Sequence, residues 1–92
     1  MINQTNILAD FSYTYVLRLS NGDLYIGSTD DLQRRMTEHS SEAAGRTTSI
    51  FHACELLYVE ACRSLAEARR REKQLKTGFG RAYLKRRLKF EL

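Results

Sequence analysis

The sequence predicts one small α+β domain with three strands and three helices, in the order β-β-α-β-α-α. Two alternating stretches, 11–19 and 23–27, flank the turn signal Ser20-Asn21-Gly22, which is typical of an antiparallel hairpin. A third stretch, 51–61, alternates most regularly over 55–60 and predicts another strand. The remaining segments carry helix caps or helical apolar spacing. A chain of 92 residues suffices for one modest core.

The length of the hairpin loop decides which face each tyrosine occupies. A two-residue loop at Asn21-Gly22 would put Tyr15 and Tyr25 on opposite faces of the sheet. A three-residue loop over 20–22, with Gly22 left-handed, would put both tyrosines on one face. We expect the three-residue loop.

The first helix is predicted over Asp30–His39. Thr29 or Asp30 can cap it, and Gln33 stands three residues after Asp30, as in a capping box. The polar residues 40–49 that follow predict a loop.

The second helix is predicted to open at the capping box Ser64-Leu65-Ala66-Glu67 and to end near Lys76. The run Thr77-Gly78-Phe79-Gly80 is expected to break it. A last, very basic helix is predicted over Arg81–Phe90.

Charge is distributed unevenly along the chain. The formal net charge is +4, yet residues 1–46 hold four Lys/Arg against six Asp/Glu, and residues 47–92 hold eleven against five. A basic half suits a polyanion such as DNA, with RNA not excluded, although a merely solvated basic surface has the same composition. No apolar run approaches the roughly 20 residues of a membrane span, so no membrane partner is predicted.

Terminal and cysteine patterns indicate a cytoplasmic protein. Residues 1–10 are polar and are expected to form a flexible segment ahead of a single domain over 11–92. They lack a basic start followed by an apolar block, so no secretory signal is predicted. Cys54 and Cys62 make a poor disulfide framework and fit free thiols in a reducing compartment.

Three polar side chains, Arg35, His39 and Glu72, are expected to lean toward the core. At roughly 100° per residue, Arg35 and His39 fall on the inward side of the first helix, whereas Arg34 points away. Glu72 falls in the middle of the apolar arc of the second helix. A carboxylate there needs a cation, a metal or strong donors, and an ion pair with Arg35 or with a basic neighbour on its own helix would also satisfy it.

These residues occur in a recognisable order: Tyr15, Tyr25-Ile26-Gly27, Leu32, Arg35, His39, Glu72, and the run from Arg70 to Gly78 followed by Gly80-Arg81. The set resembles the GIY-YIG endonuclease superfamily. The resemblance is strongest to its small stand-alone bacterial members, similar to the N-terminal nuclease domain of the UvrC excision-repair subunit. It implies a small, mainly antiparallel three-stranded sheet flanked by helices and one divalent metal, Mg²⁺ or Mn²⁺.

The resemblance also implies a role for each residue of the site. Glu72 would ligate the metal, and Tyr15 would act as, or orient, the general base that activates water. Tyr25 would hydrogen-bond the water or the phosphate. Arg35 would clamp the scissile phosphate, and His39 would assist the phosphate or a proton relay.

Two departures from the family pattern stand out. Tyr13-Thr14-Tyr15 replaces Gly-Ile-Tyr, and Ser28 follows the second motif where the repair nucleases often carry a lysine. No second DNA-binding domain is expected within the chain, so DNA affinity must come from this domain or from a protein partner. The candidate phosphate contacts are Arg46, Arg69, Arg70, Lys73, Lys76, Arg81 and Lys85. Arg71, Arg86, Arg87 and Lys89 complete the expected basic surface.

Three functions are therefore considered. The first is a divalent-metal-dependent endonuclease acting on DNA, with a role in repair or recombination. The second is a nucleic-acid-binding module of the same fold that cleaves little or nothing. The third is an interaction protein whose basic helices dock onto an acidic partner.

Overall fold

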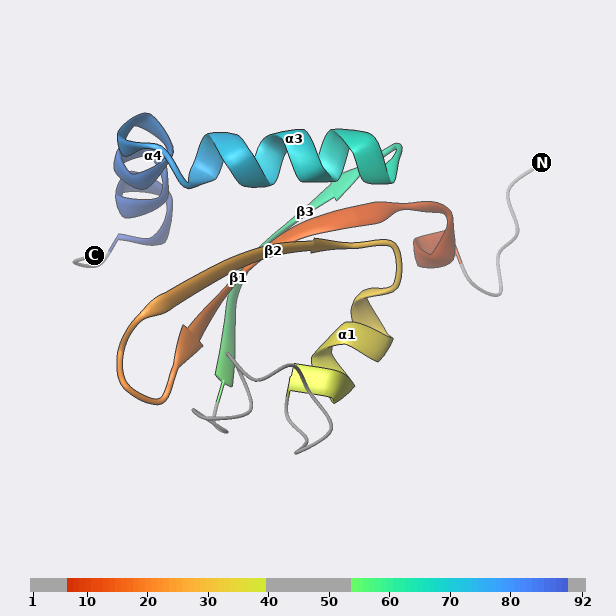
Figure 1. Cartoon of the computed structure of the whole chain (residues 1–92), viewed down its shortest axis with the longest axis horizontal. Coiled ribbons are helices and arrows are strands. Elements are labelled where there is room, and N and C mark those ends of the chain that lie inside the picture. The colour runs from red at the N-terminus through yellow and green to blue at the C-terminus, as the bar shows by residue number, and fades with distance from the viewer. Residues whose placement is uncertain (1–6, 40–53, 90–92) are drawn as a thin grey trace.

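The computed structural model describes residues 7–39 and 54–89, in which three antiparallel strands form a sheet in the order β2-β1-β3 (Figure 1). The elements in chain order are η1 (Ile7–Asp10), β1 (Ser12–Leu19), β2 (Leu24–Thr29), α1 (Leu32–His39), β3 (Cys54–Cys62), α3 (Leu65–Leu75) and α4 (Gly78–Leu88). The α+β class and the order β-β-α-β-α-α are confirmed. None of the described helices has the length and apolar content needed to cross a bilayer.

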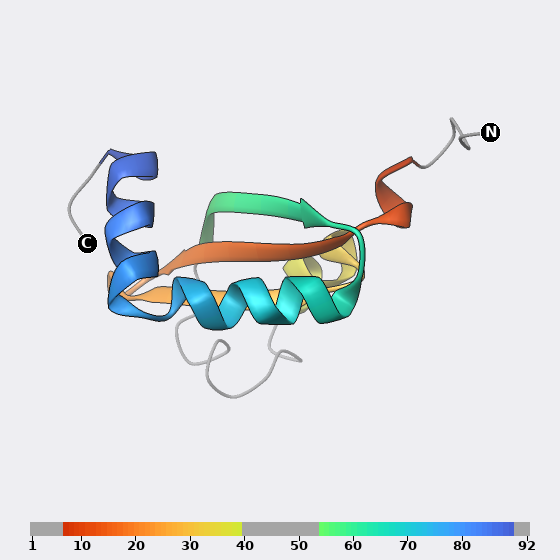
Figure 2. The ribbon, with the colours of Figure 1, turned by 90° about the horizontal axis from the view of Figure 1, so that it is seen from above.

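The helices lie on both faces of the sheet. Figure 1 shows α1 on one side and α3 on the other, and Figure 2 shows α3 running along β2, with α4 turning away from its end. The core lies on the α3 side, where Val16, Leu75 and Leu84 are almost fully buried and Ile26 packs against them. The Thr14 hydroxyl donates a 2.7 Å hydrogen bond to the Ala68 carbonyl and ties β1 to α3.

The hairpin has the three-residue loop that the sequence predicts. The Leu19 N–H donates to the Asp23 carbonyl at 2.8 Å, and the Gly22 N–H donates to the Leu19 carbonyl at 2.9 Å. Gly22 has a φ of +92°, which L side chains rarely adopt. Tyr15 therefore pairs with Gly27, and Tyr25 lies on the same face of the sheet.

The described strands differ slightly from the predicted ones at their ends, since β1 and β2 each begin one residue later and β3 runs one residue further, to Cys62. β2 continues to Thr29, two residues beyond the predicted end, which brings Ser28 into the sheet. Residues 7–10, part of the segment expected to be flexible, form the short 3-10 helix η1, and the Tyr13 hydroxyl donates to the Leu8 carbonyl at 2.6 Å. The predicted loop 40–49 lies outside the described residues.

Helix α1 begins later and with a different cap than predicted. Its first residue is Leu32, and the Asp31 carboxylate accepts the Arg34 N–H at 3.1 Å. Thr29, one of the two caps considered, instead accepts the Asp31 N–H at 3.0 Å through its hydroxyl. The prediction of Thr29 or Asp30 as the cap was wrong. Thr29, Asp30 and Asp31 can each cap a helix through a side-chain oxygen, and because β2 continues to Thr29 the helix begins late enough for Asp31 to be its cap.

Helix α3 is capped as expected, since the Ser64 hydroxyl accepts the Glu67 N–H at 3.1 Å. The predicted start of the last helix was wrong. Thr77 caps α4 by accepting the Gly80 N–H at 3.2 Å, so the helix begins at Gly78. Gly80 is required by close packing, because a Cβ there would lie 2.3 Å from the Leu75 Cα.

Candidate active site at the edge of the sheet

Tyr15 and Tyr25 form one wall of the candidate site. Their ring centroids are 6.3 Å apart, and Tyr15 is only 1% exposed. The Tyr15 hydroxyl passes over Gly27, its partner in the edge strand β2. A Cβ at position 27 would lie 2.6 Å from that hydroxyl oxygen, so the glycine provides the space in which the phenol lies. The two tyrosines are therefore brought together, as the hairpin register predicts.

Glu72 reaches the same edge from the α3 side of the sheet. Its Oε1 accepts the Ser28 hydroxyl at 2.6 Å, and its Oε2 accepts the Lys76 ammonium at 2.6 Å. The Glu72 side chain is 22% exposed, so the carboxylate is mostly shielded but accessible. Because Ser28 directly follows Gly27 in an edge strand, the carboxylate and the Tyr15 hydroxyl approach the strand from its two faces.

These neighbours change the acidity of both groups. Burial, the adjacent Tyr25 and the Glu72 carboxylate raise the pKa of the Tyr15 phenol above its usual range, and the Arg35 guanidinium only partly opposes this. Burial alone would raise the pKa of Glu72, but hydrogen bonds from Lys76 and Ser28 hold it below its usual range. At neutral pH the site therefore contains a neutral Tyr15 phenol and an ionised Glu72.

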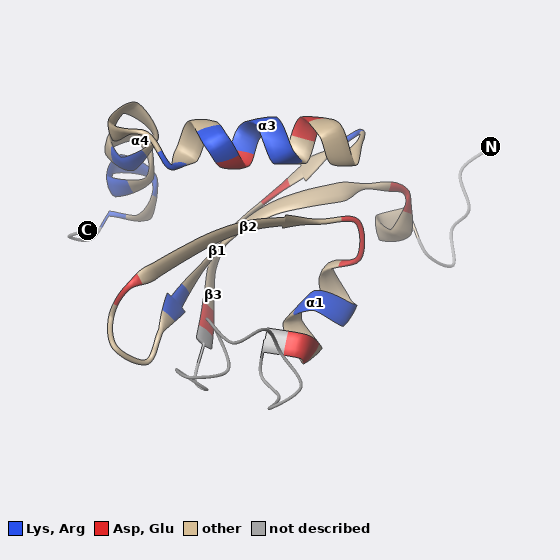
Figure 3. Cartoon of the chain, in the orientation of Figure 1, with Lys and Arg blue, Asp and Glu red and all other residues tan. Residues whose placement is uncertain are grey.

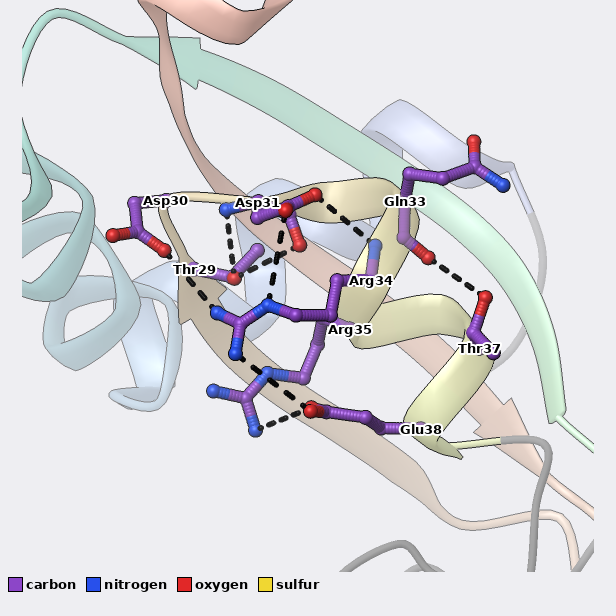
Figure 4. Close-up of polar contacts among 8 residues, drawn as sticks. All are labelled: Thr29, Asp30, Asp31, Gln33, Arg34, Arg35, Thr37 and Glu38. Atoms are coloured by element: carbon purple, nitrogen blue, oxygen red, sulfur yellow. Dashed lines mark hydrogen bonds and ion pairs between the residues drawn. The ribbon is translucent and has the colours of Figure 1, made fainter.

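Arg35 projects from α1 toward the tyrosines. Its side chain is 38% exposed, against 56% for Arg34, which agrees with the predicted inward lean. Figure 4 shows both guanidinium groups near Glu38, which lies 3.6 Å from Arg35 Nη1. Arg34 also lies within 3.5–3.7 Å of Asp30 and Asp31. The Arg35 Nε is buried and has no hydrogen-bond partner among the described residues.

Two predicted site side chains lie outside the part of the chain that the structure describes. His39 is the last residue of α1, and its side chain lies outside the described residues. Arg46 lies outside them altogether. Their roles stay predictions.

The chemistry of Glu72 fits a cation site that uses a single carboxylate. The described residues contain no group of three or more His, Cys, Asp or Glu side chains that could surround a metal. Mg²⁺ often keeps several waters and binds through one or two carboxylates plus substrate phosphates, so one ionised carboxylate suffices. Each Glu72 oxygen can accept more than one bond, although a cation on Oε2 would compete with the Lys76 ammonium.

The predicted basic surface divides into paired and unpaired side chains. Lys76 forms an ion pair with Glu72, the pairing with a basic neighbour on the same helix that helical spacing allowed. Arg71, which the sequence placed in the basic surface, forms an ion pair with Glu60 at 2.9 Å and lies 4.9 Å over the Tyr83 ring. The exposed side chains of this surface that form no ion pair with any described residue are Arg69, Arg70, Lys73, Arg81, Lys85, Arg86, Arg87 and Lys89.

Ser28 and Gly27 are the residues whose individual roles the sequence did not reveal. Ser28 was noted only as a departure from a lysine, and Gly27 only as part of a three-residue motif. Their contacts with Glu72 and Tyr15 come from parts of the chain 44 and 12 residues away. Side chains alternate between the two faces of a strand, so Ser28 lies on the opposite face from Tyr25, Gly27 and Thr29. A predicted strand that reached Thr29 would therefore have placed Ser28 toward the second helix.

Comparisons with known proteins agree on one family. The family model described as the GIY-YIG catalytic domain matches residues 11–88. The UPF0213 protein DP2720 of Desulfotalea psychrophila is 40% identical over 65 residues, covering 70% of this chain and 59% of that protein. The UPF0213 protein PA3854 of Pseudomonas aeruginosa is 45% identical over 65 residues, covering 67% and 60%.

A third relative is matched over more of its length. The UPF0213 protein SSP2268 of Staphylococcus saprophyticus is 31% identical over 68 residues, covering 74% of this chain and 83% of that protein. The chain thus spans about three fifths of the length of the first two relatives. These names state no activity. No solved structure matches the chain significantly.

Proposed function

This chain belongs to the GIY-YIG family of nuclease domains, and we propose that it is a divalent-metal-dependent endonuclease that hydrolyses phosphodiester bonds in DNA. We further propose a cytoplasmic location and a role in DNA repair or recombination.

One observation carries the proposal. Arg35 has a buried Nε donor without a partner among the described residues, and both its charge and that of the ionised Glu72 act on the buried Tyr15 phenol. A buried guanidinium donor without a partner is costly in a folded protein. A phosphate oxygen of the substrate would satisfy it, because guanidinium groups bind phosphate through directed hydrogen bonds.

Glu72 is the residue that would hold Mg²⁺ or Mn²⁺, and the hydrogen bond from the Ser28 hydroxyl would orient its carboxylate. When bound, the cation would supply positive charge opposite the phosphate in the transition state. Arg35 would clamp a non-bridging oxygen and offset the charge that develops there. These two positive charges would approach the phosphate from α3 and from α1.

Tyr15 and Tyr25 would position the attacking water. A neutral phenol both donates and accepts a hydrogen bond, so Tyr15 can orient a water molecule without becoming a phenolate. Its raised pKa disfavours direct proton abstraction by Tyr15 in the metal-free protein, and we therefore assign it the orienting role. Tyr25 would hold the water or a phosphate oxygen, and His39 would assist the proton relay.

The ion pair between Glu72 and Lys76 favours a second candidate. An ammonium already placed on the carboxylate would suit a nucleic-acid-binding module that keeps the fold and does not recruit a metal. Such a module would bind DNA in a salt-dependent way and would leave it intact.

Plasmid nicking with Mg²⁺ or Mn²⁺ tests the two candidates. Wild type should nick the plasmid, and Arg35→Ala and Glu72→Gln should each lose at least about 100-fold in rate, as is typical for removal of a group that stabilises the transition state. Arg34→Ala and Glu55→Gln are the matched controls, because both residues are exposed and form only surface ion pairs. Equal nicking by all five preparations would identify a contaminant. DNA binding without nicking would overturn the enzyme and support the binding module.

A further inference from the structure

Helix α4 exposes an aromatic ring that the proposed mechanism does not use. Phe79, in the first turn of α4, is 87% exposed and is the most exposed large apolar side chain of the described residues. The adjacent Gly80 packs against the end of α3, so the helix is held with Phe79 directed outward. Exposing an apolar ring to water costs free energy in proportion to the exposed area. Phe79 is therefore a candidate contact for a ligand.

Phe79 shares one side of α4 with a second aromatic and two cations. Tyr83 stands four residues after Phe79, Arg86 seven after it, and Arg87 four after Tyr83, which are same-face spacings in a helix. Tyr83, Arg86, Arg87 and Lys89 line an open pocket of about 220 Å³. Pockets that enclose whole small ligands hold about 300–1,000 Å³, so this one suits one unit of a longer chain.

The ring of Tyr83 forms a fixed wall of that pocket. Its hydroxyl lies 2.9 Å from the Tyr58 hydroxyl, and the Arg71 guanidinium covers one face of the ring at 4.9 Å. Arg71 is itself held by the Glu60 carboxylate. A wall fixed in this way loses little conformational entropy when a ligand binds.

The charge around this face is unbalanced. Figure 3 shows Lys and Arg concentrated on α3 and α4. Among the described residues, the basic side chains of the two helices that form no ion pair are Arg69, Arg70, Lys73, Arg81, Lys85, Arg86, Arg87 and Lys89. Aromatic rings interleaved with unpaired cations are the features that bind single-stranded nucleic acid, in which base faces are accessible and phosphates are regularly spaced.

We propose that this face of α4 binds a single-stranded segment of DNA, with Phe79 stacked on an unpaired base and Arg86, Arg87 and Lys89 holding the adjacent phosphates. The inference rests on the proposed function, which supplies the polynucleotide. Phe79 follows Lys76 by three residues, so at most about 11 Å of backbone separates it from the residue that pairs with Glu72. A DNA junction or flap bound at Glu72 could therefore place its unpaired strand on α4. A continuous duplex keeps its base faces stacked and offers Phe79 no such contact.

Tryptophan fluorescence tests the stacking contact directly. The chain contains no tryptophan, so Phe79→Trp introduces a single indole. Oligo(dT) should quench its fluorescence, and a duplex of equal length should not. Leu8→Trp is the matched control, because Leu8 is 68% exposed on η1 at the other end of the fold (Figure 1) and should show no quenching. Absence of quenching in Phe79→Trp, or equal quenching in both variants, overturns the proposal.

Affinity provides a second readout. Phe79→Ala should weaken oligo(dT) binding by about 5- to 100-fold, the range expected for loss of one stacked base, and should leave duplex affinity nearly unchanged. An equal loss for duplex and single strand would contradict stacking. Both assays are run in EDTA, so they do not depend on cleavage. If oligo(dT) binds through Phe79 but wild type does not nick DNA, the single-strand site stands and the proposed nuclease function is refuted. If wild type nicks DNA but Phe79→Ala has no effect on oligo(dT) binding, the nuclease function stands and the single-strand site is refuted.

Discussion

The Ser28 hydroxyl donates a 2.6 Å hydrogen bond to Oε1 of Glu72 across 44 residues of sequence. This bond joins the edge strand β2 to helix α3 at the point where the Tyr15 phenol passes over Gly27. The carboxylate is thus held by a neighbour of the motif that shapes the tyrosine wall. A serine at position 28 leaves the charge of Glu72 available, whereas a lysine there would add a second cation.

Ser28→Ala should loosen the carboxylate without unfolding the chain. Removing a residue that hydrogen-bonds a metal ligand typically lowers metal affinity or activity by about 10- to 100-fold. We therefore expect Ser28→Ala to lower both the Mn²⁺ affinity and the nicking rate by about 10-fold. Isothermal titration with Mn²⁺ and plasmid nicking measure the two effects. Ser28→Thr keeps the hydroxyl in a strand position and should retain most of both. Undiminished Mn²⁺ affinity in Ser28→Ala would show that Glu72 needs no support from β2.

Gly27→Ala should impair catalysis through Tyr15. The added Cβ would lie 2.6 Å from the hydroxyl and 2.7 Å from Cζ of Tyr15, so the buried ring must move. Displacement of a catalytic group by about 1 Å can reduce the rate about 100-fold, and overpacking costs about 1–3 kcal/mol of stability. Nicking rate and thermal melting measure these effects. Gly78→Ala, where a Cβ meets nothing within 4 Å, is the control. A Gly27→Ala protein as active as wild type would remove Tyr15 from the mechanism.

The hairpin register and the cap of α3 could be predicted because local chemistry decides them. Gly22 is the residue that tolerates a φ of +92°, and this fixed which tyrosines share a face. Ser64 with Glu67 formed the expected helix start. Both signals lie within a few residues of the feature that they specify.

The start of α4 and the site's supporting contacts could not be predicted because distant packing decides them. Gly80 suggested a helix break, but its backbone approaches Leu75 and the helix continues through it. Arg71 was counted with the basic surface, although Glu60 on β3 holds it. Likewise, helical spacing predicted that Glu72 faces inward but did not identify Ser28 as its partner.

Acid should destabilise the fold through Glu60, away from the proposed active site. Burial raises the pKa of this carboxyl, but hydrogen bonds from Arg71 and Tyr58 outweigh it and hold the pKa below its usual range. A lowered folded-state pKa contributes stability above the unfolded value, about 4.3, and that contribution is lost as pH falls through the folded value. The melting temperature should therefore fall between about pH 5 and pH 3.

Glu60→Gln should be less stable than wild type at pH 7, by about 1–2 kcal/mol, and its melting temperature should depend less on acid pH. Thermal denaturation followed by circular dichroism across this pH range provides the comparison. Glu55→Gln is the matched control, because its carboxylate is largely exposed and lies 4.0 Å from Arg18. If Glu60→Gln and wild type lose stability in parallel with acid, the ion pair with Arg71 does not contribute to the pH dependence.

Lys76 should compete with a cation for Glu72. Its ammonium lies 2.6 Å from Oε2 and the Lys76 side chain is 53% exposed, so the pair is solvent-screened and exchangeable. Lys76→Ala frees that oxygen and should tighten Mn²⁺ binding by up to about 5-fold, the factor that corresponds to about 1 kcal/mol for such a pair. Isothermal titration measures the change. Lys73→Ala is the control, since Lys73 is an exposed cation of the same helix without an ion pair among the described residues. Weaker Mn²⁺ binding by Lys76→Ala would mean that the ammonium positions the carboxylate and does not compete with the cation. Glu72→Gln should abolish Mn²⁺ binding both in the otherwise wild-type protein and in Lys76→Ala.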